Sequence, residues 1–498
     1  MAAHHPGIVF DTPDRWERLN RAIGPRTRRV AAIAALAAFG AFWGLAVGVG
    51  GVAALIIFMA LVACAFCVRD FRAGVALMIV IMPISQSYAF PHAMFGITGL
   101  NPLNLLLVTT LGVFVLRTAG EKGALTGFMP RPLVWLYLVP LAMGVFLGMD
   151  DVGRIPSIFR DLDMIFFDNA AGYIRDMFGK PFTFVLYALL VAAAVQRSAQ
   201  PERFVKPMVV SVAVMALLAL GYTLASGMSL SDLAGTYARH FFSPLGMHAN
   251  DLGRLYACAY ALLLFTWDRS SNLALKTLLM LCMGLVVMAL LVTFSRGAFF
   301  GFILVNIIYL VSRRSLKTII AAVLLVPIAA VIAPGAIWSR VTMGVGAGAN
   351  EVTAGRTNEI WAPLIPELDK APFFGDGLGS ILWSNAMLEG RLPLVAHPHN
   401  AFLQAFMDMG IVGIVALLGF WLFCWINFRR FAKDQRLKPE LQGFFEGAAA
   451  GTLAFVAAGF AGSSLAPAPE QLFLWLAIGV MFGVRFKFAR ATYGKRKK

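Results

Sequence analysis

The chain alternates between long apolar runs and short polar segments. A helix needs about 20 apolar residues to cross the hydrocarbon core of a bilayer, and the runs approach that length. Fourteen runs can be counted, at residues 30–49, 51–68, 73–89, 101–116, 132–149, 182–196, 207–225, 249–267, 274–294, 297–312, 318–334, 408–428, 442–462 and 470–486. Only a glycine-rich turn separates the first two, which could also form one hairpin or a re-entrant pair. The pattern predicts an all-α polytopic membrane protein with 12–14 transmembrane helices.

The polar segments between the runs predict the orientation of the chain. With the N-terminus in the cytoplasm and the segments alternating, 31 of the 42 lysines and arginines fall inside and 11 outside. Cytoplasmic loops of membrane proteins carry such an excess of positive charge, so we expect both termini in the cytoplasm. The net charge of +16 then reflects topology and attraction to anionic lipid headgroups, and no nucleic-acid partner is expected.

Composition agrees with this membrane assignment. Hydrophobic residues make up 59% of the chain and charged residues only 14%, more apolar surface than a soluble domain needs. We interpret residues 1–498 as a single integral membrane domain. The first 29 residues are polar and basic, too long a stretch for the start of a cleaved signal peptide, so the first run is expected to be an uncleaved anchor. All five cysteines fall in apolar runs, which is typical of core residues rather than disulfides or metal ligands.

Three of the predicted outside segments are long. Residues 150–181 carry apolar side chains at helical spacing, from Ile155 to Phe166, opposite charged ones. This spacing predicts an amphipathic helix that lies in the membrane interface. Residues 226–248 form the second segment, and residues 335–407 form the longest, just before the last three spans. Because long loops on a rigid scaffold tend to carry function, we expect the chemistry in the segment 335–407.

Two arginines are candidates for binding an anion. Arg296 lies at the outer end of a span, directly after Ser295, whose hydroxyl could cap the helix. An anion near that helix N-terminus would meet both the guanidinium and free backbone N–H groups. Arg356 follows a flexible glycine-rich loop and could pair bidentately with phosphate oxygens. The alternatives are a snorkelling arginine at position 296 and a solvated loop arginine at position 356.

The polar segment before the third-last span contains His397 and His399, followed by Asn400. A neutral histidine can accept the proton of a hydroxyl group. The alternatives are a histidine that caps the next helix, a metal-binding pair and a plain surface loop. A metal pair lacks neighbouring cysteine, aspartate or further histidine ligands, so no metal is expected.

A second polar group lies at the outer end of an earlier span. His248, Asn250 and Arg254 fall within two helical turns there. They could line the same cavity as the later histidines, or they could simply form a capped helix start.

Several of these residues belong to longer motifs. The segment H-P-H-N-A-F-L-Q-x-x-x-D-x-G-I-V-G-I is preceded by G-x-G-L-G-S at Gly375 to Ser380. Upstream, in order, lie M-H-A-N-D-L-G, T-F-S-R-G-A around Arg296, and the segment from Gly355 to Trp361. These motifs, which span about residues 245–420, resemble the signature of the superfamily of O-antigen ligases and O-antigen or exopolysaccharide polymerases.

The resemblance implies a metal-independent membrane glycosyltransferase of the GT-C type, without cofactors, in the bacterial inner membrane. The donor would be a glycan on undecaprenyl diphosphate, and the acceptor a sugar hydroxyl on a lipid A core or on another lipid-linked glycan. Arg296 and Arg356 would hold the diphosphate, and His399, or alternatively His397, would be the general base, in a periplasmic catalytic loop over residues 335–407. Four further residues are expected to bind substrate: Asn400, His248, Asn250 and Arg254.

The chain length and the large span count favour a polymerase slightly over a ligase, and the choice stays open. A lipid-linked glycan flippase would also have many spans and cationic residues in a cavity. It would place charged residues near the bilayer midplane and show related halves, whereas the candidate residues here gather at one face. A scaffold for polysaccharide assembly is the third hypothesis.

Overall fold

A computed structural model describes residues 25–94, 97–119, 129–315, 320, 335–344, 346–462 and 464–496. The chain divides into two compact units, Met1–Ala65 and Phe66–Lys498, and the single integral membrane domain expected from the sequence stays a prediction. The second unit contains every candidate site residue.

The described residues are mainly helical. Nine of their helical segments are long and apolar enough to cross a membrane, namely Arg29–Gly51, Arg131–Gly148, Ala170–Arg197, Pro201–Ser226, Leu273–Val292, Arg296–Arg313, Ala401–Ala432, Pro439–Ala461 and Pro469–Ala489. Three shorter apolar helices follow the same pattern, Ala54–Arg69, Phe71–Ile84 and Pro102–Thr118. This confirms the predicted helical fold of membrane type. The predicted span 318–334 lies almost entirely outside the described residues, as do residues 1–24 and 497–498, so the count of 12–14 spans and the cytoplasmic termini stay predictions.

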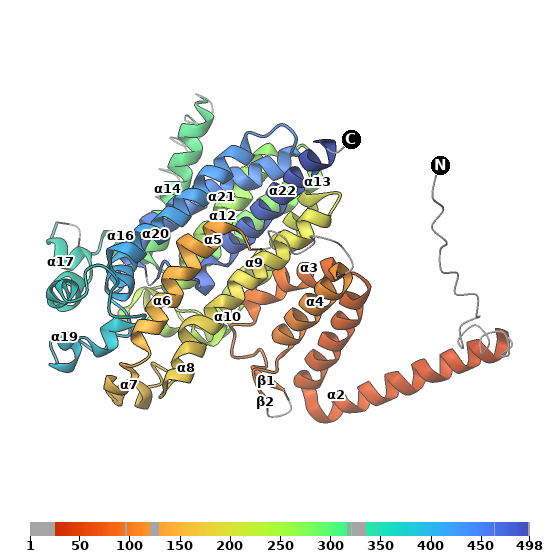
Figure 1. Cartoon of the computed structure of the whole chain (residues 1–498), viewed down its shortest axis with the longest axis horizontal. Helices are drawn as coiled ribbons and strands as arrows, with labels where there is room; N and C mark the ends of the chain where they lie inside the picture. Colours follow the sequence, from red (N-terminus) through yellow and green to blue (C-terminus); the bar gives the residue numbers. More distant parts are fainter. Residues whose placement is uncertain are drawn as a thin grey trace, which may run out of the picture. The chain divides into compact units, whose positions relative to one another are not determined.

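The first unit contains most of helix α2, Pro25–Arg69, which covers the first two apolar runs (Figure 1). Its backbone kinks at Gly51, with φ 58° and ψ −144°. Trp43 packs against Phe58 across this kink, with ring centroids 4.9 Å apart. The glycine-rich turn expected between the two runs is therefore a kink, since only glycine adopts this backbone conformation readily.

The second unit is organised around α12, Ala249–Arg269. It packs against α13 (Leu273–Val292), α14 (Arg296–Arg313) and α21 (Pro439–Ala458). Helices α12 and α21 lie close together because Gly443 and Gly447 of α21 face α12. A Cβ at these positions would lie 2.3 and 2.5 Å from backbone carbonyl oxygens of α12. Small residues spaced four apart allow this approach of two membrane helices.

A second pair of helices is also brought close together by two glycines spaced four residues apart. The helices α9, Lys180–Arg197, and α22, Leu472–Arg496, pack side by side. Gly479 and Gly483 of α22 lie against α9, where added Cβ atoms would come within 2.5 and 2.6 Å of its backbone carbonyl oxygens. The two glycine pairs thus fix the distance between neighbouring helices in the core.

The remaining elements complete the second unit. They are α3 Phe71–Ile84, β1 Ala93–Met94, β2 Ile97–Thr98, α4 Pro102–Thr118, α5 Arg131–Leu133, η1 Val134–Leu138, α6 Val139–Gly148, η2 Val152–Arg154, α7 Ile158–Asp161, α8 Ala170–Ile174, η3 Arg175–Gly179, η4 Pro201–Phe204, α10 Val205–Ser226, α11 Leu230–Ala234, η5 Thr236–His240, η6 Ser243–Leu245, α16 Gly335–Thr342, α17 Ala349–Val352, η7 Thr357–Trp361, α18 Ala362–Leu364, η8 Ile365–Asp369, η9 Ser380–Trp383, α19 Asn385–Leu388, α20 Ala401–Ala432, η10 Gly459–Ala461 and η11 Pro469–Gln471. The only sheet among the described residues is the antiparallel pair β1–β2.

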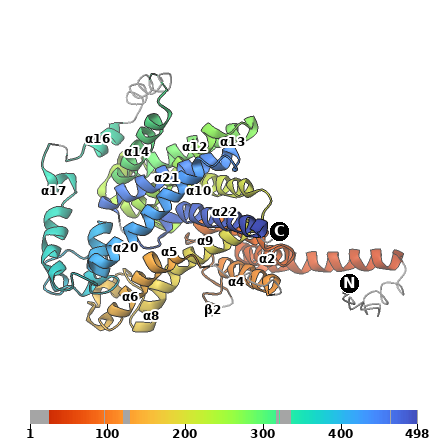
Figure 2. The same ribbon diagram turned by 45° about the horizontal axis from the view of Figure 1, so that its top comes forward.

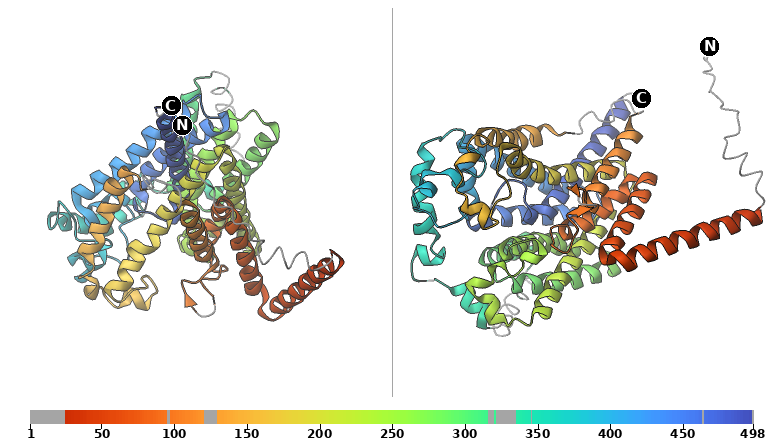
Figure 3. Two further views of the ribbon diagram at one scale, coloured as in Figure 1. Left: turned by 45° about the vertical axis from the view of Figure 1, so that its right-hand side comes forward. Right: turned by 90° about the horizontal axis from the view of Figure 1, so that it is seen from below.

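The segment 335–407, which is predicted to lie outside the membrane and is called the outside segment below, lies along one end of the helices of the second unit. In Figures 2 and 3 its cyan part, with α17, follows the end of the bundle where α20 begins. Short helices and turns (α16 to α19) make up its described part. It is therefore a folded cap rather than a simple connection.

The segment 150–181 differs from the predicted amphipathic helix. Before Ala170 it contains only the three-residue η2 and the four-residue helix α7, and the residues from Ala170 onward already belong to a helix long enough to span the membrane. Pro156 precedes α7, and Asp163 follows it with a left-handed φ of 54°, so a regular helix cannot continue. Phe159 is fully buried while Phe166 is exposed. The apolar spacing thus reflects packing under the loop as well as surface exposure.

The start of α20 is shaped by a kink at Gly410, with φ 62° and ψ −167°. The backbone freed by the kink pairs with an upstream segment. The N–H of Ile411 donates to the carbonyl of Pro372 (2.9 Å), and that of Val412 donates to the carbonyl of Phe373 (3.1 Å). A Cβ at position 410 would lie 2.3 Å from the carbonyl carbon of Phe373. This glycine therefore joins the outside segment to the span.

We predict that Gly410→Ala destabilises the protein by about 1–3 kcal/mol, because alanine is strained in this conformation and collides with the paired backbone. Thermal unfolding of the purified protein in detergent would measure this. Gly419→Ala in the same helix is the control, since a Cβ there meets nothing closer than 4.0 Å. Equal melting temperatures for the two variants would contradict the role given to the kink.

Candidate functional site

Three predicted site segments lie at helix starts, and each start is capped by a side chain. Ser295 Oγ accepts the N–H of Ala298 (3.3 Å), which confirms the predicted cap of α14. His248 Nδ1 accepts the N–H of Asn250 (3.2 Å) at the start of α12. Asn400 Oδ1 accepts two backbone N–H groups at the start of α20, at 3.0 and 3.1 Å. His248 and Asn400 thus have structural roles, and their substrate-binding roles stay predictions.

His397 and His399 form a compact pair. Their ring centroids are 4.1 Å apart at an interplanar angle of 72°. His399 has a left-handed φ of 53°, and its N–H donates to Nδ1 of His397 (3.3 Å). The indole N–H of Trp361 donates to the carbonyl of Pro398 (2.8 Å) and fixes the segment between the two rings.

These bonds distinguish the two rings. His397 uses the lone pair of Nδ1 as an acceptor, so its neutral form carries the proton on Nε2. Within the described part of the chain, no hydrogen bond involves the ring nitrogens of His399. His399 is therefore the ring that remains available for another partner.

Both rings are neutral at pH 7. Burial lowers the pKa of His399 to about 2, with further lowering by His397 and Arg356. Burial, Arg254 and Arg356 lower the pKa of His397 to about 4. Burial and the neighbouring His240 lower the pKa of His248 to about 4. Positive charge in a partly dry site disfavours a further cation, so each imidazole keeps a free lone pair.

Arg356 lies close to Arg296, the other arginine that the sequence analysis names as a candidate for binding an anion. Burial lowers the pKa of Arg356 to about 10, and the charges of Arg296, Arg254 and Arg340 add to the effect. The guanidinium of Arg356 has no hydrogen-bond partner among the described residues, whereas Arg296 Nη1 donates to the carbonyl of Met343 (3.1 Å). The structure thus brings these two predicted arginines and the histidine pair into one electrostatic neighbourhood.

Two further arginines, missed by the sequence analysis, join this neighbourhood. Arg239 Nη1 donates to the carbonyl of Phe294 (3.1 Å), and its buried Nη2 has no partner in the described chain. Arg340 is buried and contacts the sulfur of Met343 (3.2 Å), and its Nε likewise lacks a partner among the described residues. Burial and neighbouring arginines lower the pKa of both.

We call Arg239, Arg296, Arg340 and Arg356 the arginine cluster. Within the described residues, none of the four forms an ion pair with a carboxylate. Charged groups in partly desolvated positions are normally paired, so this cluster is suited to bind a polyanion such as a diphosphate.

Arg254 is held differently from the cluster. It is buried, with an exposed fraction of 3%, and forms ion pairs with Asp251 and with Glu470 (3.2 Å). It also donates to the carbonyl of Ala461 (3.5 Å). Since two carboxylates offset its charge, Arg254 links α12 to the C-terminal helices, and its substrate-binding role stays a prediction. Asn250 lies beside it at the start of α12, half-buried.

Asp408 anchors the glycine-rich segment beneath the site. This buried carboxylate of α20 accepts the N–H groups of Gly379 (2.9 Å) and Ser380 (3.3 Å) and the hydroxyl of Ser380 (3.2 Å). A Cβ at Gly377 would lie 2.3 Å from the backbone of Gly148. The G-x-G-L-G-S and D-x-G motifs therefore form one structural unit that supports the start of α20.

The described residues contain no group of three or more histidine, cysteine, aspartate or glutamate side chains placed to hold a metal ion.

Comparison with known proteins supports the family suggested by the motifs. Residues 278–418 match the family model described as O-Antigen ligase, in agreement with the resemblance of the motifs. The matched range includes Arg296, Arg340, Arg356 and the histidine pair. A search of curated proteins finds no match. The match indicates a glycosyl-transferring enzyme, and with the nine apolar helices it indicates a multi-pass membrane protein.

We predict that the histidine site makes stability depend on pH. The pKa of His399 is about 2 when folded and about 6.5 when unfolded. Below pH 6.5 the unfolded chain therefore binds the proton and the folded chain does not, so stability is lost as pH falls. Between pH 7.5 and 5 we expect the free energy of unfolding to fall by about 1 kcal/mol more in the wild-type protein than in His399→Gln.

Thermal unfolding at the two pH values would test this. His92→Gln, which replaces an exposed histidine, should behave like the wild type. If His399→Gln lost as much stability as the wild type, the ring would be protonated in the folded protein and the site would not be cationic.

Proposed function

We propose that this chain, which the match over residues 278–418 places in the O-antigen ligase superfamily, transfers a glycan from undecaprenyl diphosphate to a sugar hydroxyl at the periplasmic face of the inner membrane. The observation that carries the proposal is the arginine cluster, which has no carboxylate partner among the described residues, beside a neutral histidine pair. The acceptor is a glycan or a lipid A core, and the proposal covers both the ligase and the polymerase.

The arginine cluster would bind the diphosphate of the donor. Arg296 and Arg356 are the two predicted diphosphate ligands, and the guanidinium of Arg356 is free of other hydrogen bonds in the described chain. As the bond between the anomeric carbon and the phosphate oxygen breaks, negative charge grows on the leaving diphosphate. Cations that are already in place stabilise that charge without reorganisation. No divalent ion is required in this proposal.

His399 would act as the general base. Its ring is neutral and without hydrogen bonds to described residues, so Nδ1 or Nε2 can take the proton of the acceptor hydroxyl. The acceptor oxygen then bonds to the anomeric carbon from the side opposite the departing diphosphate, which inverts the configuration. His397 is the alternative base, but its Nδ1 already accepts a backbone N–H.

Donor binding would also activate the base. The pKa of His399 is low in the free protein partly because Arg356 lies nearby. A bound diphosphate offsets positive charge in the cluster and raises the histidine pKa towards neutrality. The imidazole would thus become a stronger base only when the donor is present, which limits wasteful reaction with water.

The other predicted substrate ligands surround this centre. Asn250 and His248 at the start of α12, and Asn400 at the start of α20, would contact the sugars of donor or acceptor. Arg254 would contribute through its charge, which lowers the pKa of both His397 and His399.

We predict that His399→Ala, Arg296→Ala and Arg356→Ala each reduce glycan transfer at least about 100-fold, because each removes a base or a charge needed in the transition state. Transfer by purified protein, at equal amounts of folded enzyme, would measure this. Arg391→Ala is the control, since Arg391 lies in the same outside segment but pairs with Glu389 at the surface. Full transfer by His399→Ala would exclude this residue as the base.

The glycans of a strain that lacks this chain would test the function itself. Long chains stranded on undecaprenyl diphosphate, with bare lipid A core, indicate a ligase. Single repeat units that accumulate at the periplasmic face, without long chains, indicate a polymerase. Units trapped at the cytoplasmic face indicate a flippase and would overturn the proposal.

A further inference from the structure

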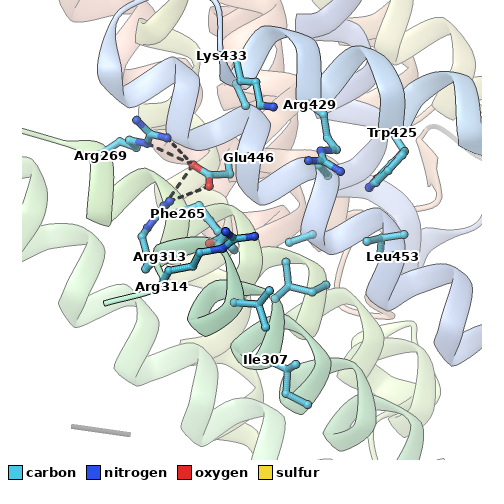
Figure 4. A pocket seen from close by; sticks show the side chains of 16 residues that line it. Phe265, Arg269, Ile307, Arg313, Arg314, Trp425, Arg429, Lys433, Glu446 and Leu453 are labelled. Carbon is cyan, nitrogen blue, oxygen red and sulfur yellow. Dashed lines mark hydrogen bonds and ion pairs between the residues drawn. The ribbon is translucent and has the colours of Figure 1, made fainter. Parts of the chain in front are cut away.

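A groove lies at the other end of the helices that build the candidate site. It is lined by the C-terminal parts of α12, α14 and α20 and by the middle of α21, and it encloses about 610 Å³ (Figure 4). The starts of α12, α14 and α20 carry His248, Arg296 and Asn400. The 18 residues of α14 separate the two ends by about 27 Å. The groove is therefore distinct from the candidate active site.

One wall of the groove carries compensated charges. Glu446 of α21 forms ion pairs with Arg269 (3.2 Å) and Arg313 (2.8 Å), and Asp268 also pairs with Arg313 (2.8 Å). Figure 4 shows Glu446 between the two arginines. This wall is a structural connection between α12, α14 and α21.

Three further cations at the groove are not compensated. Arg314, Arg429 and Lys433 are exposed, and none of them forms an ion pair within the described part of the chain. Arg429 also lies over the ring of Trp425, 5.0 Å from its centroid. Counted over the described residues, the mouth of the groove thus has an excess of three positive charges.

The floor of the groove is apolar and open. Ile307 and Val311 of α14 and Leu453 of α21 line it, with exposed fractions of 50%, 64% and 39%. Trp425 also lines the groove, one helical turn before Arg429 on α20, and tryptophan is enriched at the boundary between hydrocarbon and headgroups. An occupant must therefore have an anionic head and an apolar tail.

We propose that this groove binds an anionic glycerophospholipid, with its phosphate at Arg314, Arg429 and Lys433 and its acyl chains along α14 and α21. The volume is within the range of small-molecule sites. The charge alternation of the sequence predicts this helix end to be cytoplasmic, and the cytoplasmic leaflet is rich in anionic phospholipids that basic pockets between helices bind. The proposal does not depend on the proposed glycan transfer.

Native mass spectrometry of the full-length protein would test the site with three probes: phosphatidylglycerol, phosphatidylethanolamine and undecaprenyl phosphate. We expect phosphatidylglycerol to bind more tightly than the other two. The double variant Arg429→Gln/Lys433→Gln should weaken its binding about 25-fold, or about fivefold for each charge removed. Arg430→Gln is the matched control, because Arg430 is an exposed neighbour on α20 that does not line the groove.

A second variant tests occupancy of the groove apart from its charge. Leu453→Trp keeps all cations and fills the apolar floor, so it should also reduce phosphatidylglycerol binding while Arg430→Gln retains it. Equal binding by wild type and both groove variants, or equal loss in Arg430→Gln, would overturn the proposal. Tighter binding of undecaprenyl phosphate than of phosphatidylglycerol would overturn the choice of phospholipid.

Discussion

Uncompensated positive charge is the constraint around which the end of this protein that carries the candidate site is arranged. In the arginine cluster, Arg239 and Arg296 donate to the backbone carbonyls of Phe294 and Met343, and none of its four members pairs with a carboxylate in the described part of the chain. Carboxylates would stabilise the free protein, but they would also compete with an anionic ligand. The histidines depend on the same charge, which together with burial keeps their rings unprotonated. The same positive charge would therefore bind the diphosphate leaving group and keep the proposed histidine base unprotonated.

The scaffold under this end is held by a few backbone-specific contacts. Gly410 opens the backbone of α20, and Asp408 receives the glycine-rich segment around Gly379. Both contacts lie within three residues of each other on one helix, directly below the histidines. The position of His399 therefore depends on the same helix that anchors the outside segment.

Much of the fold follows from the sequence, because apolar runs of membrane length leave few alternatives to helices. The predicted cap at Ser295 was also accessible, since a hydroxyl before an apolar run is a local signal. The contributions of Arg239 and Arg340 could not be predicted from the sequence, because only tertiary structure brings these two residues next to Arg296. The amphipathic pattern of the segment 150–181 misled because buried loop residues can repeat at helical spacing.

The ion pair between Arg254 and Glu470 joins parts of the chain that are 216 residues apart. The helix that carries Arg254 is not among the nine apolar helices of membrane length, although most of it is buried by its neighbours. During synthesis α12 therefore leaves the ribosome long before its distant counter-charge exists. Asp251, on the same helix, can pair with Arg254 from the beginning, and Glu470 completes the pairing only once the C-terminal part of the chain has been made. A chain truncated before Glu470 would therefore leave the buried Arg254 with only one of its two carboxylate partners.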